Sequence, residues 1–271
     1  MTARHALAAA AARIAAVSPT ARLDAELLMA HAMGVSRETL LLSRLDDPAP
    51  PAFADLVARR LAHEPVAYIT GTRAFWTIEL AVEPGVLVPR ADSETLIEAA
   101  VAHFAGTGGP GSVLDLGTGS GALLLAALDE WPRARGVGID ASDAALAIAA
   151  ANAARLGMET RARFARGGWG GDGARHDLIL CNPPYIATDD VLPREVVEWE
   201  PASALFAGAD GLDDYRAIAG VLRAQLALGG VACVEVGSTQ ADVVGALFAD
   251  AGFAVAVRRD LAGHARCLVL T

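Results

Sequence analysis

The segment Asn182-Pro183-Pro184-Tyr185 has the residue types needed to hold and orient a planar NH2 group. It directly follows the apolar run 176–181, which predicts a buried strand. The Asn182 side chain and the ring-restrained Pro183 backbone each offer a carbonyl oxygen, and Tyr185 offers an aromatic wall. Two acceptors match the two hydrogens of an amide or amine. We therefore predict Asn182, Pro183 and Tyr185 as catalytic residues, with all four residues binding substrate.

We call residues 182–185 the clamp, and such an arrangement suits methyl transfer to nitrogen. An amide or exocyclic amine nitrogen is a poor nucleophile because its lone pair is delocalised. Acceptors that hold the two hydrogens would turn this lone pair toward an activated methyl group. Bringing the reacting atoms to ~3–3.5 Å then lowers the barrier without a strong base. A Pro-Pro turn without chemistry is the competing interpretation, and the position after a strand favours the clamp.

A glycine-rich loop follows the apolar run 112–116 and predicts a cofactor site. Its candidate binding residues are Gly117, Thr118, Gly119, Ser120 and Gly121. Asp140 ends the next strand, where an acid can accept hydrogen bonds from ribose hydroxyls. The loop lacks the GxGxxG spacing of dinucleotide sites, and the preceding Asp115 would repel a pyrophosphate. An acid here suits a ligand with an amino group and a sulfonium, so we predict S-adenosylmethionine; ordinary turn glycines are the alternative.

Three other residues invite a functional interpretation. Trp169, in the run GGWGG, could lie against the cofactor adenine, or it could be an ordinary core residue. His176 and His264 could serve as bases, but we interpret them as loop and surface histidines. No metal site is expected, because the three cysteines are far apart and lack CxxC spacing.

The order of elements places these motifs on a sheet. Short apolar strands alternate with helices, which predicts a parallel sheet covered on both faces and an α/β fold. The expected strands are 112–117, 135–140, 161–167, 176–181, 229–237, 254–260 and 266–271.

The residues before this sheet lack its alternation of strands and helices. Residues 1–74 predict a helical domain, which we expect to recognise the substrate. In it Leu23, Leu27, Leu28 and Met33 share one face of a helix that ends at Gly34. Residues 75–90 alternate in polarity around a turn at 83–86 and predict a linking hairpin. The third part, 91–271, begins with a helix that Asp92 or Ser93 is suited to cap.

The composition of the chain limits the classes of binding partner that it can have. The chain of 271 residues is 54% hydrophobic with a net charge of −10, which describes a folded globular protein without a basic face for nucleic acid. We interpret the cluster Arg161, Arg163 and Arg166 as a solvated strand edge. No uncharged run approaches the ~20 residues of a membrane span. Reduced cysteines and a cytoplasmic location are therefore expected.

Several long segments resemble one family. The glycine loop followed by the 182–185 clamp is similar to methyltransferases that modify planar NH2 groups of adenine or glutamine. Segments 64–98, 198–216 and 258–266 resemble the release factor glutamine methyltransferase (HemK-like) family, so the resemblance covers nearly the whole chain.

The resemblance implies a helical N-terminal domain, a hairpin and a seven-stranded, Rossmann-like class I methyltransferase domain. It implies methylation of the glutamine in the GGQ motif of class I peptide chain release factors by a cytoplasmic enzyme, which we expect to be a monomer. Residues 117–121 and Asp140 would hold S-adenosylmethionine, and Trp169 would cover its adenine. Asn182 would contact both cofactor and substrate, and residues 182–185 would grip the glutamine.

Two positions need comment against the family pattern. Gly168 stands where the family carries an acid, so an adenine hydrogen bond is either lost or supplied by Asp172. Arg90, Asp92 and Glu94 match a family segment in which Ser93 replaces threonine. We interpret these residues as structural, capping and positioning the following helix.

Three other functions compete. A sister group methylates a ribosomal-protein glutamine, but the acid pair of residues 92–94 favours the release factor enzymes. An adenine-N6 methyltransferase has an equivalent clamp, and the acidic net charge argues against it. A non-catalytic scaffold would not need the intact clamp and glycine loop.

Overall fold

The computed structural model describes residues 1–271, which separate into two compact units. The helical unit contains Met1–Thr72 and Leu192–Trp199, and the sheet unit contains Arg73–Val191 and Glu200–Thr271. The sequence pattern did not predict that Leu192–Trp199 groups with the helical unit.

The helical unit buries an apolar core between short helices. Gly34 ends the second helix in the left-handed conformation, with φ +64°, as its sequence indicated. The expected apolar face is wrong in one respect, because Leu23 is 41% exposed while Ala25, Leu28 and Met29 are buried. The helices are α1 (Ala3–Ile14), α2 (Ala21–Met33), α3 (Arg37–Thr39) with a π-helical turn at Leu40–Arg44, α4 (Phe53–Leu61), α5 (Val66–Thr70) and α9 (Arg194–Trp199).

The rotation of α2 has a physical cause. Asp24 is buried and its Oδ2 accepts a hydrogen bond from Nε of buried Arg60, in α4, at 2.8 Å. Glu26 is also buried and pairs with Arg22 and Arg37. Facing these acids inward turns Leu23 outward.

The hairpin forms, but its turn is not where the pattern placed it. Strands β1 (Thr72–Phe75) and β2 (Ile78–Ala81) leave Trp76 and Thr77 as the turn of the hairpin. A turn also forms at 84–85, but it follows β2, so the prediction that it joins the two strands is wrong. Trp76 has φ +54°, an unusual conformation for a tryptophan. Its N–H donates to Glu94 Oε1 at 2.9 Å, and this long-range bond holds the tight turn.

The sheet unit contains a seven-stranded sheet in the order β5-β4-β3-β6-β7-β9-β8, which confirms the predicted fold class. Strands β3 to β7 run parallel, and β9 is antiparallel to both β7 and β8. The strands are β3 (Ser112–Leu116), β4 (Arg135–Asp140), β5 (Ala162–Arg166), β6 (His176–Cys181), β7 (Leu226–Glu235), β8 (Val255–Arg259) and β9 (Ala265–Leu270).

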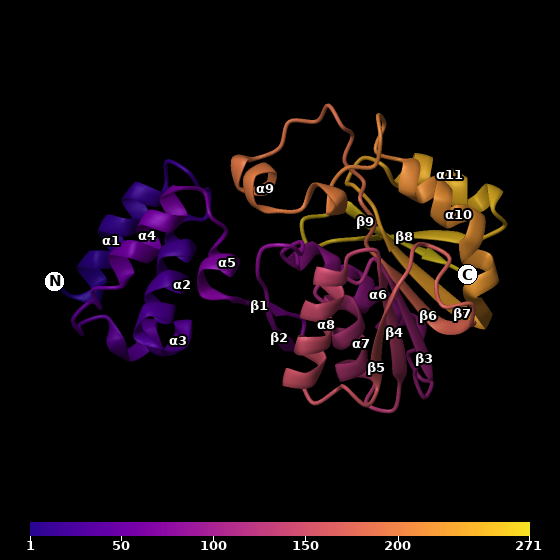
Figure 1. Cartoon of the computed structure of the whole chain (residues 1–271), viewed down its shortest axis with the longest axis horizontal. Helices are drawn as coiled ribbons and strands as arrows, with labels where there is room; N and C mark the ends of the chain where they lie inside the picture. Colours follow the sequence, from indigo (N-terminus) through magenta and orange to yellow (C-terminus); the bar gives the residue numbers. More distant parts are fainter. The chain divides into compact units, whose positions relative to one another are not determined.

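Helices cover both faces of this sheet (Figure 1). Alternate residues of β3 show why: Val113 packs into the core cluster with α6 and α7, and Leu114 packs into the opposite cluster with α10 and α11. Burying each such side chain contributes about 1.5–3 kcal/mol. The helices are α6 (Glu94–His103), α7 (Ala122–Glu130), α8 (Asp143–Arg155), α10 (Asp213–Gln225) and α11 (Ala241–Asp250).

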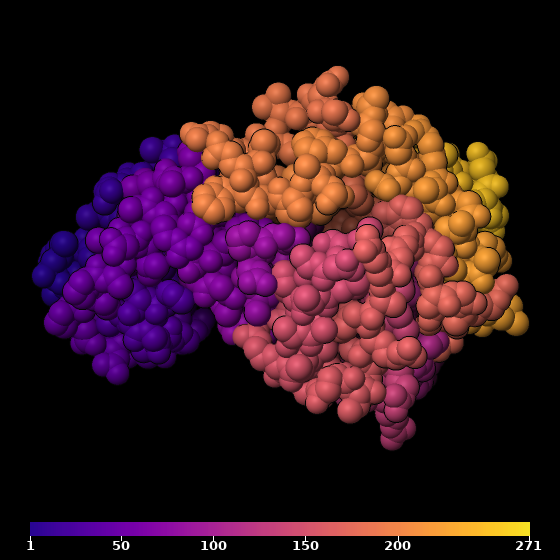
Figure 2. Space-filling view, viewed as in Figure 1, coloured from indigo at the N-terminus to yellow at the C-terminus, as the bar shows by residue number.

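The parallel strands β3 to β6 end at the same edge, so the loops after them meet there. The segment that follows the clamp, residues 188–191, is exposed and belongs to the orange part of the surface view (Figure 2). No helix in the structure combines the length and the apolar composition required to cross a membrane.

Candidate active site

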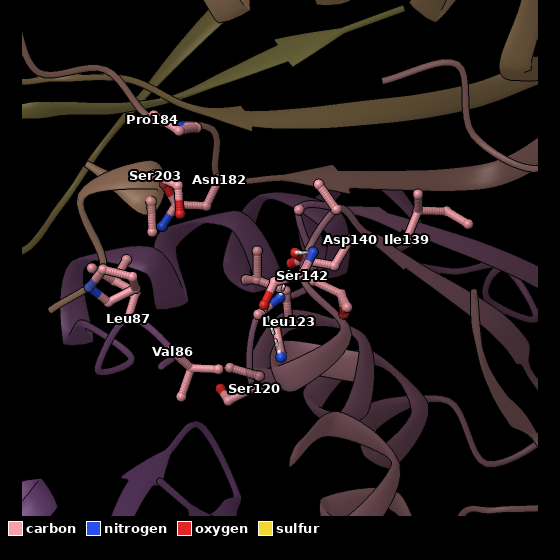
Figure 3. A pocket seen from close by; sticks show the side chains of 18 of the residues that line it. Val86, Leu87, Ser120, Leu123, Ile139, Asp140, Ser142, Asn182, Pro184 and Ser203 are labelled. Carbon is pink, nitrogen blue, oxygen red and sulfur yellow. Dashed lines mark hydrogen bonds between the residues drawn. The ribbon is translucent and has the colours of Figure 1, made fainter. Parts of the chain in front are cut away.

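A cavity of about 500 Å³ lies at this sheet edge, entirely within the sheet unit. Its wall comes from the loops after β3, β4, β5 and β6, together with parts of 85–93 and 201–204 (Figure 3). The volume is in the range of small-molecule and cofactor sites.

The glycine loop after β3 forms one wall of the cavity through Gly117, Thr118, Gly119 and Ser120, and Gly121 follows directly without lining it. Gly117 has φ +73°, and a Cβ atom added there would touch the Trp169 ring at 3.4 Å. Gly121 has φ +84°, and its Cβ would lie 3.1 Å from Leu125 Cδ1. The loop therefore needs glycine both for its conformation and for close packing.

Asp140, at the end of β4, connects two loops of the site. Its Oδ2 accepts a hydrogen bond from the Gly119 N–H and its Oδ1 accepts one from the Ser142 N–H, both at 2.9 Å. Both Asp140 and Ser142 line the cavity (Figure 3). Each carboxylate oxygen retains acceptor capacity, so Asp140 is placed to accept from ligand hydroxyls.

Asp115 does not face the cavity, which corrects our interpretation of this acid as a partner of a ligand's cationic groups. It is 1% exposed and its Oδ2 accepts from Thr118 Oγ1 at 2.6 Å and from the Leu124 N–H at 3.3 Å. Burial raises the pKa of Asp115 to about 7, although both hydrogen bonds oppose the rise. The carboxyl holds the glycine loop against the start of α7.

Trp169 and Asp214 form a pair on the cavity wall. Trp169 Nε1 donates to Asp214 Oδ1 at 2.9 Å, and both residues line the cavity. Partial burial raises the pKa of Asp214. Asp172 is not at the site, because it bonds His176 Nε2 at 3.0 Å instead. The acid near Trp169 thus comes from α10, and the sequence analysis missed it.

The clamp residues divide between the cavity and the core. Asn182 and Pro184 line the cavity, whereas Pro183 is buried and does not. The Tyr185 ring packs against the core beside α10 and α11, and its hydroxyl donates to Glu235 Oε1 at 3.4 Å. The roles of these four residues in binding glutamine stay predictions.

Ser93 is a site residue that the sequence analysis interpreted as a helix cap. Its side chain makes no capping hydrogen bond to α6, so that prediction is wrong. Instead Ser93 Oγ accepts a hydrogen bond from Asn182 Nδ2 at 3.2 Å. The neighbouring polar residues also make long-range contacts, namely Arg90 with Glu200 at 2.5 Å, Asp92 with Arg266 at 3.1 Å and Glu94 with the Trp76 N–H.

Neither histidine considered above lines the cavity. His264 is exposed as expected, but His176 is a buried residue of β6 rather than a surface residue. The structure brings no group of three or more His, Cys, Asp or Glu side chains together in a way that could hold a metal ion.

Comparison with known proteins agrees with this architecture. Residues 5–71 match the PrmC N-terminal domain family, and residues 91–199 match the methyltransferase small domain family. A methyltransferase from Pyrococcus furiosus has a similar fold, with a TM-score of 0.56 at 16% identity, over 80% of this chain and 97% of that one.

Relatives named release factor glutamine methyltransferase match over most of their length. The Cereibacter sphaeroides protein is 45% identical over 98% of this chain and 97% of the relative. The Rhodospirillum rubrum protein is 45% identical over 92% of this chain and 78% of the relative. With this identity over both units, the chain belongs to the release factor glutamine methyltransferase family.

Proposed function

We propose that this protein methylates the side-chain amide nitrogen of the glutamine in the GGQ motif of class I peptide chain release factors, using S-adenosylmethionine. The observation that carries the proposal is the placement of Asn182. Its Nδ2 donates to Ser93, so its Oδ1 is the group left to accept a hydrogen bond at the cavity wall. An acceptor at this place is what a substrate NH2 group requires.

The cavity residues fit S-adenosylmethionine. Residues 117–121 allow close approach of a ligand to the backbone, Asp140 offers acceptors for ribose, and Trp169 offers a flat surface for adenine. When bound, this cofactor supplies a methyl group activated by a sulfonium and leaves as a neutral thioether.

The chain's own contribution is orientation. Asn182 Oδ1 would accept one amide hydrogen of the glutamine. The predicted acceptor of the second is the backbone carbonyl of Pro183, although Pro183 is buried and does not line the cavity in this structure. With both hydrogens held, the nitrogen lone pair is directed away from the clamp, which replaces the need for a strong base. The nitrogen gains the methyl group and loses one proton to water, so no titrating residue has to act.

A protein substrate fits the charge of the chain better than a nucleic acid does. The net charge of −10 opposes binding to a phosphate backbone. Since release factors act in translation, we expect a cytoplasmic enzyme, and we propose that it works as a monomer. Tight, salt-sensitive retention of duplex DNA or structured RNA in a filter-binding assay would instead support the adenine-N6 function.

The decisive experiment incubates the protein with a purified release factor and methyl-labelled cofactor, followed by mass mapping. We expect one methyl group on the GGQ glutamine and none on a release factor whose motif glutamine is replaced by alanine. A ribosomal protein tested in parallel distinguishes the sister activity. Methylation elsewhere, or none, contradicts the proposal.

A further inference from the structure

Trp169 is held at both ends of its indole ring, so this flat wall of the cavity has a fixed position. Its Nε1 donates to Asp214 Oδ1 at 2.9 Å. At the other end, ring carbons Cζ3 and Cη2 lie so near Gly117 that an added Cβ would be 3.4 Å from both. Gln225 Nε2 also donates to the Trp169 backbone oxygen at 2.8 Å. A base that stacks on this ring therefore meets a rigid surface.

The bond from Trp169 places the Asp214 carboxylate at the edge of this surface. An indole N–H lies in the plane of its ring, so its acceptor lies beside the ring and not over its face. A base stacked on the indole lies about 3.5–4.0 Å above that plane, the usual separation of carbon atoms in contact. The second oxygen, Oδ2, makes no hydrogen bond within the protein, and Asp214 lines the cavity. Oδ2 is thus placed to accept from the edge of a stacked base.

The adenine of the cofactor has one group that suits this acceptor. A carboxylate only accepts hydrogen bonds, and the exocyclic N6 amine is the only donor on the base of an adenosine. The ring nitrogens are acceptors, which a carboxylate repels. The amine lies at the end of the base away from the ribose, and Asp140 at the end of β4 offers acceptors for the ribose. Two acids from different elements therefore match the two ends of an adenosine.

The residues next to Trp169 in sequence supply no alternative acceptor. Gly167 and Gly168 line the cavity without side chains, and Asp172 does not line it. We propose that Asp214 recognises the N6 amine of the cofactor adenine and so selects adenine over purines that carry an oxygen at this position. This inference concerns the cofactor site and does not depend on which nitrogen the enzyme methylates.

Binding of S-adenosylhomocysteine and S-inosylhomocysteine, measured by calorimetry, tests this recognition. The inosyl ligand has a carbonyl oxygen in place of the amine, and the carboxylate would repel it. Partial burial raises the pKa of Asp214, so the titrations are made at pH 8 to keep this carboxyl ionised. We expect the parent to bind the adenosyl ligand at least about tenfold more tightly, the effect of one hydrogen bond to a charged group.

Asp214→Asn should remove this preference without changing the shape of the side chain. Trp169 Nε1 can only donate, so the asparagine oxygen turns toward it and the asparagine NH2 group faces the base. This NH2 group opposes the adenine amine and can donate to the inosyl oxygen. We expect the Kd of the adenosyl ligand to rise about fivefold and the Kd of the inosyl ligand to fall, so that the adenosyl ligand no longer binds more tightly.

A second variant and a control separate recognition of the base from support of the Trp169 ring. Trp169→Phe removes the Nε1 donor and leaves Asp214 in place, so both ligands should weaken while the preference for the adenosyl ligand remains. Asp213→Asn makes the same change of charge in the same turn of α10. Asp213 is exposed, does not line the cavity and pairs with Arg216 at 3.0 Å, so this control should bind both ligands as the parent does.

Three results would overturn the inference. The first is a parent that binds both ligands equally or binds neither. The second is an Asp214→Asn variant that weakens both ligands by the same factor, because Asp214 would then only hold Trp169. The third is an equal loss of preference in Asp213→Asn, which would make charge at a distance the cause. Failure to methylate a release factor would leave these binding results unchanged, so this inference and the proposed function can fail separately.

Discussion

Asp115→Asn should change how stability depends on pH, because this buried carboxyl is costly to ionise. Its pKa is raised from 3.8 to about 7 by burial, and its Oδ1 has no hydrogen-bond partner. Below pH 3.8 the group is protonated in both folded and unfolded chains and costs nothing. As pH rises from 3.8 toward 7, the Asp115 carboxyl ionises in the unfolded chain but stays protonated in the folded one. The folded state therefore loses stability over this range, and above pH 7 the loss is complete.

The magnitude follows from the two pKa values. The interval from 3.8 to about 7 corresponds to roughly 4 kcal/mol, of which about 3 kcal/mol falls between pH 5 and pH 8. The asparagine variant lacks this loss. Its free energy of unfolding relative to the parent should therefore rise by about 3 kcal/mol across that range. Other titrating groups, Glu235 included, cancel in the difference.

Urea unfolding followed by tryptophan fluorescence is a suitable assay. Trp199 belongs to the helical unit, so a Trp199→Phe background leaves only the three tryptophans of the sheet unit as probes. Any constant penalty from the asparagine NH2 group lowers the free energy of unfolding by the same amount at every pH. It therefore does not affect the slope of stability against pH. Parallel pH profiles for parent and variant would refute the reasoning.

Three further predictions concern other parts of the chain. Trp169→Ala should weaken S-adenosylmethionine binding by about 1.4 kcal/mol, a tenfold increase in Kd by calorimetry, while Asp214→Asn keeps an acceptor for Trp169 and should change Kd less. Arg60→Met leaves the buried Asp24 carboxylate unpaired and should destabilise the helical unit by about 3–5 kcal/mol, measured by circular dichroism during urea unfolding; an unchanged midpoint would contradict this. Gly121→Ala should cost about 1 kcal/mol or more in the stability of the sheet unit, because its φ of +84° disfavours a Cβ; a higher melting temperature would count against it.

The sequence predicted the elements whose signals are local. The seven strands follow from short apolar runs, and the order of strands and helices placed the loops containing Asp140 and Asn182 at one sheet edge. Gly34 and the glycines of residues 117–121 were recognisable from their positions at a helix end and after a strand, and they adopt positive φ in the structure.

What the sequence did not predict depends on contacts between distant segments. Ser93 looked like a helix cap, since nothing near it indicates a bond to Asn182, 89 positions away. Asp214 stands in the first turn of α10, where an acid is ordinary. The hairpin turn was misplaced because Trp76, not a glycine, takes the positive φ.

The helical unit is a discontinuous domain, since Leu192–Trp199 completes it. Arg60 Nη2 lies 2.7 Å from the Glu195 carboxylate, which is encoded more than a hundred residues later. Cutting the gene after residue 72 would therefore separate this arginine from one of its two acids. Any exchange of the helical unit between relatives has to carry both pieces together, so the two stretches are expected to vary in concert.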